Sequence, residues 1–166
     1  MPRILLTALL ALAVTAPAAQ ACPGQLSRPF TPWLDFAQYT PAPSFEQGWT
    51  LDGATIVDGG QPWGGGASSL AIPAGAGAVS APTCVTPAHP TMRFFAKGTG
   101  VLTVSVLAGG LEVPIGAVVG TGGWAPTLVM PIVLNFLGEQ SVQFRFTSAV
   151  GDFQIDDVYI DPYSKG

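Results

Sequence analysis

The chain has 166 residues, of which 48% are hydrophobic and only 10% are charged, and its formal net charge is −4. Its six Lys and Arg residues are scattered, so the composition excludes the basic surface that a phosphate backbone requires, and with it a nucleic-acid-binding role. The length fits a single domain that buries a sizeable core.

The first 21 residues have the three regions of a secretory signal peptide. Arg3 supplies the positive start, residues 4–14 are apolar, and residues 19–21 (Ala-Gln-Ala) form a small-x-small cleavage site. The apolar run is shorter than the roughly 20 residues of a membrane-spanning helix, and Pro17 interrupts its end. We expect residues 1–21 to be removed and the mature protein to be secreted, with no transmembrane segment in the mature chain.

Cleavage at this site makes Cys22 the first mature residue, and Cys84 is the only other cysteine. Two cysteines in an exported chain predict one disulfide. Acylation of Cys22, as in a lipoprotein, is the competing interpretation, although residues 19 and 20 fit a lipobox poorly. Two free buried thiols are a third alternative, which is less expected outside the cytosol.

After a proline-punctuated lead-in, residues 22–43, the chain alternates short apolar runs with Gly and Pro and has no long stretch at helical period. Such a pattern predicts a β-sandwich or barrel, which we assign to residues 44–163. The segment 130–137 stays open between a helical turn and a covered loop, because Pro131 argues against a central strand. The candidate strands are 49–51, 54–57, 69–72, 78–80, 91–97, 102–107, 111–119, 125–129, 141–147 and 153–160.

The closing run, residues 153–160, holds two adjacent carboxylates, Asp156 and Asp157, among apolar and β-favouring residues. Neighbouring side chains on a strand point to opposite faces, so both can face solvent only if the strand bulges. We expect one of them to face the packed side. A buried carboxylate there requires hydrogen bonds, an ion pair or a metal.

Several short motifs follow one another in a characteristic order. They are Ser44-Phe45-Glu46 and Gly48-Trp49-Thr50, then Ser69 to Ile72, Met92 to Gly98, Gly123-Trp124 and finally Phe153 to Val158. This order resembles that of the galactose-binding-like jelly rolls, and also that of small uncharacterised secreted proteins of actinobacteria. The resemblance implies an all-β jelly-roll β-sandwich of two antiparallel sheets with little or no helix. The fold hosts carbohydrate-binding modules, enzyme accessory domains and structural units alike.

The resemblance to carbohydrate-binding modules also implies a structural calcium ion, with Glu46 and Asp156 as the matching ligands and Asp157 as a less certain third. A hard cation takes carboxylate oxygens and would neutralise buried charge. The alternative is that Glu46 and Asp156 accept hydrogen bonds from backbone amides or pair with Arg93 or Arg145.

Exposed aromatic side chains are the binding candidates in such folds, because their flat faces stack on sugar rings. Trp63 is the strongest, since three glycines follow it in a loop. We expect Trp49 and Trp124 to belong to the core and Trp33 to pack the lead-in onto the sandwich.

No catalytic constellation is recognisable, so we expect that the protein is not an enzyme. His89 is the only histidine and lies between prolines, in a turn-like segment without a nucleophile motif. Glycoside hydrolysis needs two separated carboxylates directed at one bond, whereas Asp156 and Asp157 are adjacent. We expect a secreted, non-catalytic module that binds carbohydrate. The alternative is a structural or protein-interaction domain at the cell surface with no small ligand.

Overall fold

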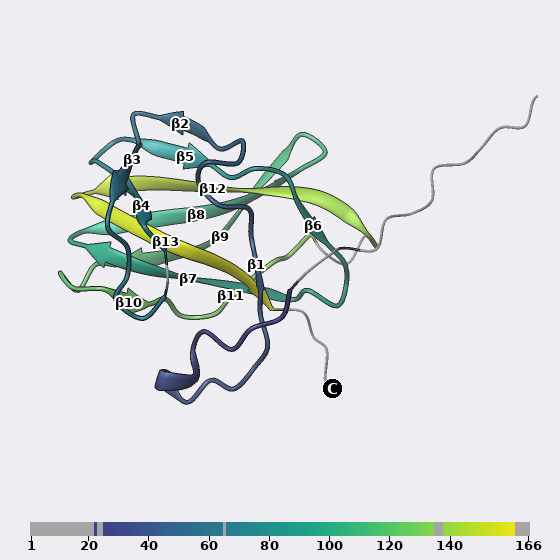
Figure 1. Cartoon of the computed structure of the whole chain (residues 1–166). Helices are drawn as coiled ribbons and strands as arrows, with labels where there is room; N and C mark the ends of the chain where they lie inside the picture. Colours follow the sequence, from purple (N-terminus) through teal and green to yellow (C-terminus); the bar gives the residue numbers. More distant parts are fainter. Residues whose placement is uncertain (1–21, 23–24, 65, 135–137, 162–166) are drawn as a thin grey trace, which may run out of the picture.

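The computed structural model describes residues 22, 25–64, 66–134 and 138–161. The predicted signal peptide, residues 1–21, lies outside the described residues. Within them the chain is almost entirely strand and loop, and the one helix is the 3-10 turn η1 (Thr31–Trp33) (Figure 1). No helix in the described part of the chain is both long and apolar enough to span a membrane.

One layer of the fold is a seven-stranded antiparallel sheet in the order β10-β7-β13-β4-β3, to which β1 adds beside β13 and β11 beside β7. Its strands are β1 (Thr40–Pro41), β3 (Thr55–Asp58), β4 (Ser68–Ile72), β7 (Thr91–Gly98), β10 (Ala125–Pro126), β11 (Met130–Pro131) and β13 (Phe153–Asp161).

The other layer is a six-stranded antiparallel sheet in the order β2-β5-β12-β8-β9, with β6 paired to β12. Its strands are β2 (Thr50–Asp52), β5 (Gly77–Val79), β6 (Thr83–Val85), β8 (Val101–Ala108), β9 (Leu111–Val119) and β12 (Gln140–Val150). The two sheets confirm the predicted β-sandwich.

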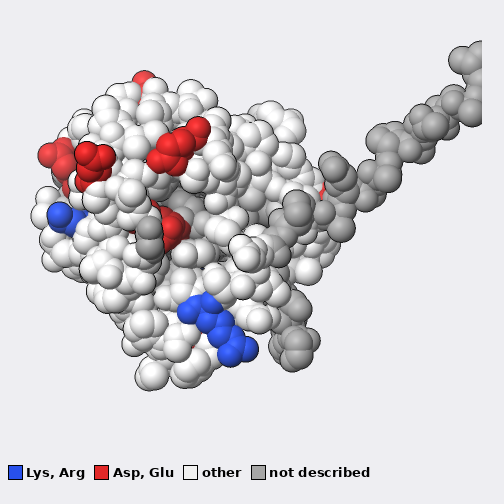
Figure 2. Space-filling view, viewed as in Figure 1, with Lys and Arg blue, Asp and Glu red and all other residues white. Residues whose placement is uncertain are grey.

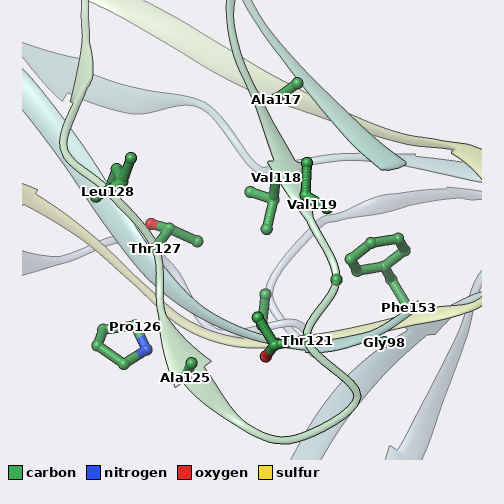
Figure 3. Close-up of a pocket in the computed structure, with 12 residues that line it drawn as sticks. Gly98, Ala117, Val118, Val119, Thr121, Ala125, Pro126, Thr127, Leu128 and Phe153 are labelled. Carbon is green, nitrogen blue, oxygen red and sulfur yellow. The ribbon is translucent and has the colours of Figure 1, made fainter. Parts of the chain in front are cut away.

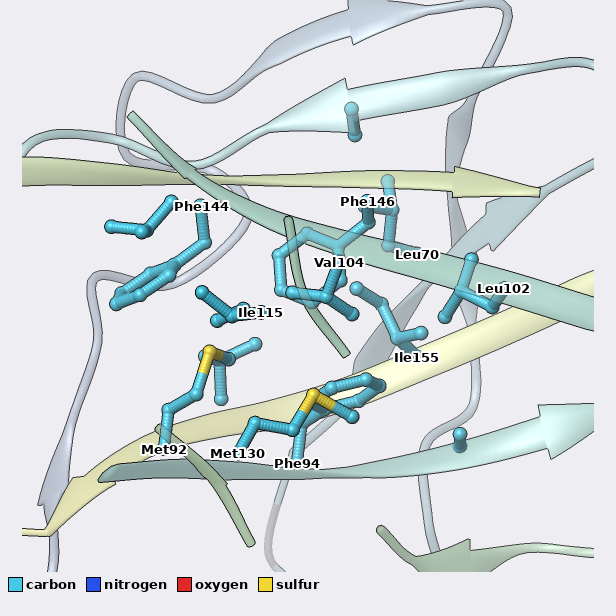
Figure 4. Close-up of a cluster of buried hydrophobic side chains, with 14 of the residues drawn as sticks. Leu70, Met92, Phe94, Leu102, Val104, Ile115, Met130, Phe144, Phe146 and Ile155 are labelled. Carbon is cyan, nitrogen blue, oxygen red and sulfur yellow. The ribbon is translucent and has the colours of Figure 1, made fainter. Parts of the chain in front are cut away.

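The main core lies between the sheets because alternate residues of each strand point inward. In β8 and β12 the inward residues include Leu102, Val104, Phe144 and Phe146, all fully buried, and they meet Phe94 of β7 from the opposite sheet (Figure 4). The predicted alternation of these two strands is confirmed.

The lead-in covers the outer face of the seven-stranded sheet and adds a second apolar cluster there. Phe30 and Tyr39 pack on Phe95 of β7, with Trp33 and Trp124 at the margin. Figure 1 shows the dark-blue lead-in below β7 and β13, on the side away from the six-stranded sheet. As a result, β7 is buried on both faces from Met92 to Ala96.

Arg93 of β7 fastens the lead-in to this face. Its guanidinium lies 4.2 Å from the centroid of the Phe30 ring, forms an ion pair with Asp35, and donates from Nε to the Thr127 carbonyl oxygen at 2.9 Å. Burial alone would raise the pKa of Asp35, but hydrogen bonds from Tyr39, the Ala37 amide and Arg93 lower it overall. Segment 25–39 is thus held by charge as well as by packing.

The predicted disulfide is present and joins Cys22 to Cys84, whose Cα atoms are 5.3 Å apart. Three sequence expectations need correction. The strand expected at 125–129 ends at Pro126, because the Thr127 hydroxyl, in place of a backbone carbonyl, accepts from the Phe94 amide at 3.2 Å. Residues 130–131 form the short strand β11 rather than a helical turn. Residues 83–85 form β6, which the apolar pattern does not indicate.

Candidate functional site

The outer face of the seven-stranded sheet carries most of the polar and aromatic residues that could bind a ligand. Arg93, Phe95 and Lys97 point outward from β7, because the alternate residues Met92, Phe94 and Ala96 belong to the core. On β13, Phe153 and Ile155 face the core, so Gln154 and Asp156 point outward beside them. Beside Asp156 the strand is irregular.

A β-bulge interrupts the pairing of β13 with β7 between Asp156 and Tyr159. Asp157 has a φ of +46°, a left-handed conformation that non-glycine residues rarely adopt. After the bulge Val158 points into the core again. The sequence raised the question of how two adjacent carboxylates fit in one strand, and the bulge answers it.

Asp156 is only 3% exposed and accepts two backbone hydrogen bonds. Its Oδ2 accepts from the Gln61 amide and its Oδ1 from the Asp157 amide, both at 2.8 Å. Burial raises the pKa of Asp156 to about 6; the two amides oppose this rise, and the charges of Asp157 and Glu46 add to it. Asp156 therefore does accept hydrogen bonds from backbone amides.

Gln61 holds the glycine-rich β3–β4 loop onto the bulge. Its side chain is 4% exposed; Nε2 donates to Asp157 Oδ2 at 2.6 Å, and Oε1 accepts from the Trp63 amide at 2.7 Å. A Cβ on Gly60 would lie 2.3 Å from Asp156 Oδ2, and one on Gly64 would lie 2.0 Å from Gln61 Nε2. A larger residue at Gly60 or Gly64 would thus force the side chain of Asp156 or Gln61 to shift from its hydrogen bonds.

Glu46, Asp156 and Asp157 line one cavity of about 330 Å³ beside the loop. Glu46 is exposed; a hydrogen bond from Ser68 Oγ to its Oε1, at 2.6 Å, contributes most to lowering its pKa. In Figure 2, acidic side chains lie on the upper part of the visible surface and in a hollow near its centre. The two ion pairs of the described residues join Arg93 to Asp35 and Arg145 to Glu112, so neither arginine pairs with these three acids.

One set of three potential metal-ligating side chains converges within 4.8 Å among the described residues: Cys22, Cys84 and Glu139. Both sulfurs of this set are joined in the disulfide, so it offers no thiolate ligand. The three carboxylates of the acidic cavity do not converge to that degree. Carboxylate oxygens are nevertheless the type of ligand that a hard cation such as calcium takes.

Trp63 is 48% exposed and stands on other aromatic rings at the edge of the covered face. Its ring centroid lies 4.7 Å from that of Trp33, with the planes at 86°, and 5.7 Å from that of Phe95. Trp33 also contacts Phe95, at 5.5 Å. The ring that the sequence singles out is thus solvent-accessible but fixed by packing.

Next to Phe95, the same sheet face opens into a groove of about 450 Å³. Its floor is a row across three strands, since Gln154 is in register with Lys97 on one side and with Ala71 on the other. Thr99 and Asp152 lie at its end, where Asp152 Oδ1 accepts from the Ala74 amide at 2.9 Å.

The outer face of the six-stranded sheet has no aromatic residue among its described strands. The phenylalanines of β12 face the core, and Thr103, Ser105, Gln143 and Thr147 alternate with inward residues. Among the described strands, only the seven-stranded sheet therefore has an aromatic side chain on its outer face.

A separate apolar cleft of about 290 Å³ lies between the two sheets at one edge of the sandwich (Figure 3). Val118 and Phe153 line it, and Leu128 and Val119 stand at its rim with 86% and 74% exposure.

Sequence reasoning missed Gln61 and Lys97 as site residues. A single amide or amine carries no periodic signal, although the position of Gln61 between Gly60 and Pro62 places it in a tight loop. Trp49 and Trp124 pack at the margins of the two clusters, and Trp33 packs the lead-in onto the sheet, as expected.

Neither a protein-family model nor a curated protein sequence matches the chain. Several solved structures do match the chain. The CBM22-1–GH10 modules of xylanase 10B from Clostridium thermocellum, complexed with xylohexaose, are similar at 22% identity and a TM-score of 0.52 over 72% of this chain. The chain spans 26% of the length of that xylanase chain.

A mutant of a family 29 carbohydrate-binding module is similar at 13% identity and a TM-score of 0.52, over 76% of this chain and 92% of the module. An exo-β-1,3-galactanase from Phanerochaete chrysosporium, with galactose, is similar at 13% identity and a TM-score of 0.50, over 75% of this chain and 30% of the galactanase chain. The chain therefore has the β-sandwich fold of carbohydrate-binding modules.

Proposed function

We propose that the protein is a secreted, non-catalytic carbohydrate-binding module. The observation that carries the proposal is Trp63, an aromatic ring that is 48% exposed yet held against Trp33 and Phe95. A ring already fixed by packing loses little conformational entropy when a sugar stacks on it. Similar structures contain xylohexaose and galactose, which supports a sugar as the ligand class.

Secretion is supported by the signal-peptide pattern of residues 1–21 and by the disulfide, which is typical of oxidising compartments. A non-catalytic role is supported by the state of the carboxylates. Both oxygens of Asp156 already accept backbone hydrogen bonds, and Asp157 is engaged by Gln61. Neither is arranged as one of two separated acids around a scissile bond.

A glycan array followed by titration calorimetry tests this proposal, using the mature protein, Trp63→Ala and the control Phe36→Ala. Phe36 is an aromatic residue of the lead-in with 60% exposure. We expect Trp63→Ala to weaken binding about tenfold, the size of a lost aromatic contact, and Phe36→Ala to leave it unchanged. Absence of binding to any glycan by the intact protein would refute the carbohydrate function.

We also propose that the acidic cavity holds a structural calcium ion, with Glu46 and Asp156 as ligands and Asp157 as a third. Two features support it: the three carboxylates line one cavity, and Asp156 is buried beside two acids without a cationic partner. The ion would supply charge neutralisation and fix the bulge, without taking part in a reaction.

Thermal unfolding with calcium and with a chelator tests the ion. We expect calcium to raise the Tm of the wild type and of the control Asp58→Asn, an exposed acid of β3, but not that of Asp156→Asn. An identical Tm of the wild type in calcium and in chelator would remove the calcium proposal.

The alternative function, a structural or protein-interaction domain, is favoured by the apolar rim formed by Val119, Leu128 and Val129, all more than half exposed. Apolar residues gathered in this way mark contact surfaces. Cross-linking at the surface of the producing cells, with wild type and Leu128→Glu, tests it. Capture of a protein by the wild type alone, together with a silent glycan array, would favour this alternative.

A further inference from the structure

Trp33, Trp63 and Phe95 form an aromatic platform on the outer face of the seven-stranded sheet. The open groove next to Phe95 carries the polar groups that this platform lacks. Lys97 provides an ammonium, Gln154 an amide and Asp152 a carboxylate, within one depression of about 450 Å³. Pockets of this size take small ligands, and a few convergent polar groups fix their orientation. The groove is therefore suited to a ligand with both hydroxyl groups and charge.

The sheet itself sets the spacing of these groups. Lys97, Gln154 and Ala71 are register neighbours on β7, β13 and β4, so they form one row with about 4.8 Å between strands. The small side chain of Ala71 keeps the end of the row low. Because strand register fixes this row, it exists before any ligand arrives.

The groove is adjacent to the aromatic platform. Phe95, which contacts Trp63 at 5.7 Å between ring centroids, points outward two residues before Lys97 on the same strand. Side chains at such positions are about 7 Å apart, so Lys97 lies one step along the strand from the ring that Trp63 contacts. A saccharide stacked on Trp63 can thus extend its neighbouring unit over Lys97 and Gln154.

The unpaired charge of Lys97 indicates which class of sugar the groove would bind. Lys97 is exposed and forms no ion pair with any described residue, whereas Arg93 and Arg145 are paired with Asp35 and Glu112. The groove holds one other charge, the Asp152 carboxylate, which accepts a hydrogen bond from the Ala74 amide and forms no ion pair with Lys97. The Lys97 ammonium therefore favours a ligand that brings its own carboxylate.

On the basis of the proposed function, we propose that this groove is a subsite for a uronic acid residue. Lys97 binds the uronate carboxylate, Gln154 and Asp152 take hydroxyl groups, and Trp63 stacks on the neighbouring sugar. The ligand class is then an acidic oligosaccharide rather than a neutral one.

The test compares acidic oligosaccharides with their own methyl esters, which keep the sugar and remove the charge. The probes are oligogalacturonides and the aldouronic acids of glucuronoxylan, titrated at low and high salt into wild type, Lys97→Gln and Arg28→Gln. Arg28 is an exposed cation of the lead-in outside the groove, so its variant matches the change in net charge. Unfolding curves check that each variant is folded.

We expect an acid to bind about tenfold more tightly than its ester, the lower end of a charge-assisted hydrogen bond, and salt to reduce the difference. Lys97→Gln abolishes the preference and Arg28→Gln retains it. Equal affinity for acid and ester, or a preference that survives Lys97→Gln, would overturn the subsite. If neutral glycans bind through Trp63 and no acidic one does, the subsite is wrong and the proposed function stands; if no glycan binds, both are wrong.

Discussion

Replacing Phe30 by alanine tests whether the lead-in is an integral part of the fold. Phe30 is 0% exposed, and its ring centroid lies 4.9 Å from that of Tyr39, 5.1 Å from Phe95 and 5.6 Å from Tyr159. Truncating a buried Phe to Ala in a core costs about 3–5 kcal/mol. The Arg93 guanidinium over the ring adds a cation–π contact, so we expect about 4 kcal/mol or more.

Urea denaturation measures this loss, and in a domain of this size it corresponds to a fall in Tm of roughly 8–16 °C. Phe36→Ala is the matched control, because Phe36 lies in the same segment and is 60% exposed; it should change stability by less than about 0.5 kcal/mol. A loss below about 1 kcal/mol for Phe30→Ala would show that the lead-in does not contribute to the folded state as described, and the reasoning would fail.

Three other substitutions give further expectations. Serine at both Cys22 and Cys84 should cost up to about 4 kcal/mol in the chain-entropy model, given a sequence separation of 62, and reduction of the wild type should reproduce the loss in a denaturation curve. Gly60→Ala should destabilise by about 1–3 kcal/mol because its Cβ would lie 2.3 Å from Asp156 Oδ2; an unchanged Tm would contradict this close approach. In calcium-free buffer, the pKa of about 6 for Asp156 lies above the value near 4 of the unfolded chain, so its protonation stabilises the fold below pH 4 and this contribution is lost as the pH rises through 6. It amounts to at most about 3 kcal/mol, and the difference between wild type and Asp156→Asn across pH 4–7 measures it; a constant difference would refute the shift.

The parts of the fold that the sequence predicts are those with a period of two. Leu102 to Leu107 and Val142 to Thr147 alternate because one face is buried and the other is wet, and both form strands as expected. The lead-in has no such period, since prolines and a 3-10 turn break it, so its docking follows only from tertiary contacts. The run from Met92 to Ala96 is apolar at every position except Arg93 rather than alternating, which is typical of a strand covered on both faces.

For the candidate site, the sequence identifies the residues whose placement is costly and misses those that compensate the cost. Asp156 stands out because a carboxylate inside an apolar strand needs partners. Its partners are backbone amides of Gln61 and Asp157, and an amide exists at almost every position, so the sequence cannot indicate which ones serve. Lys97 belongs to the groove through register with Gln154, a relation between strands that are more than 50 residues apart along the chain.

The pairing of β1 with β13 affects how the protein reaches its native state. Thr40 is in register with Ile160, and the lead-in before β1 rests on β7 and β13. Contacts between segments this distant in sequence form only after a long loop has closed, which slows folding of β-sandwiches to milliseconds or seconds. A chain synthesised from its N-terminus therefore cannot complete the seven-stranded sheet until β13 has emerged. The lead-in, although it is synthesised first, is therefore among the last segments to take its place in the fold.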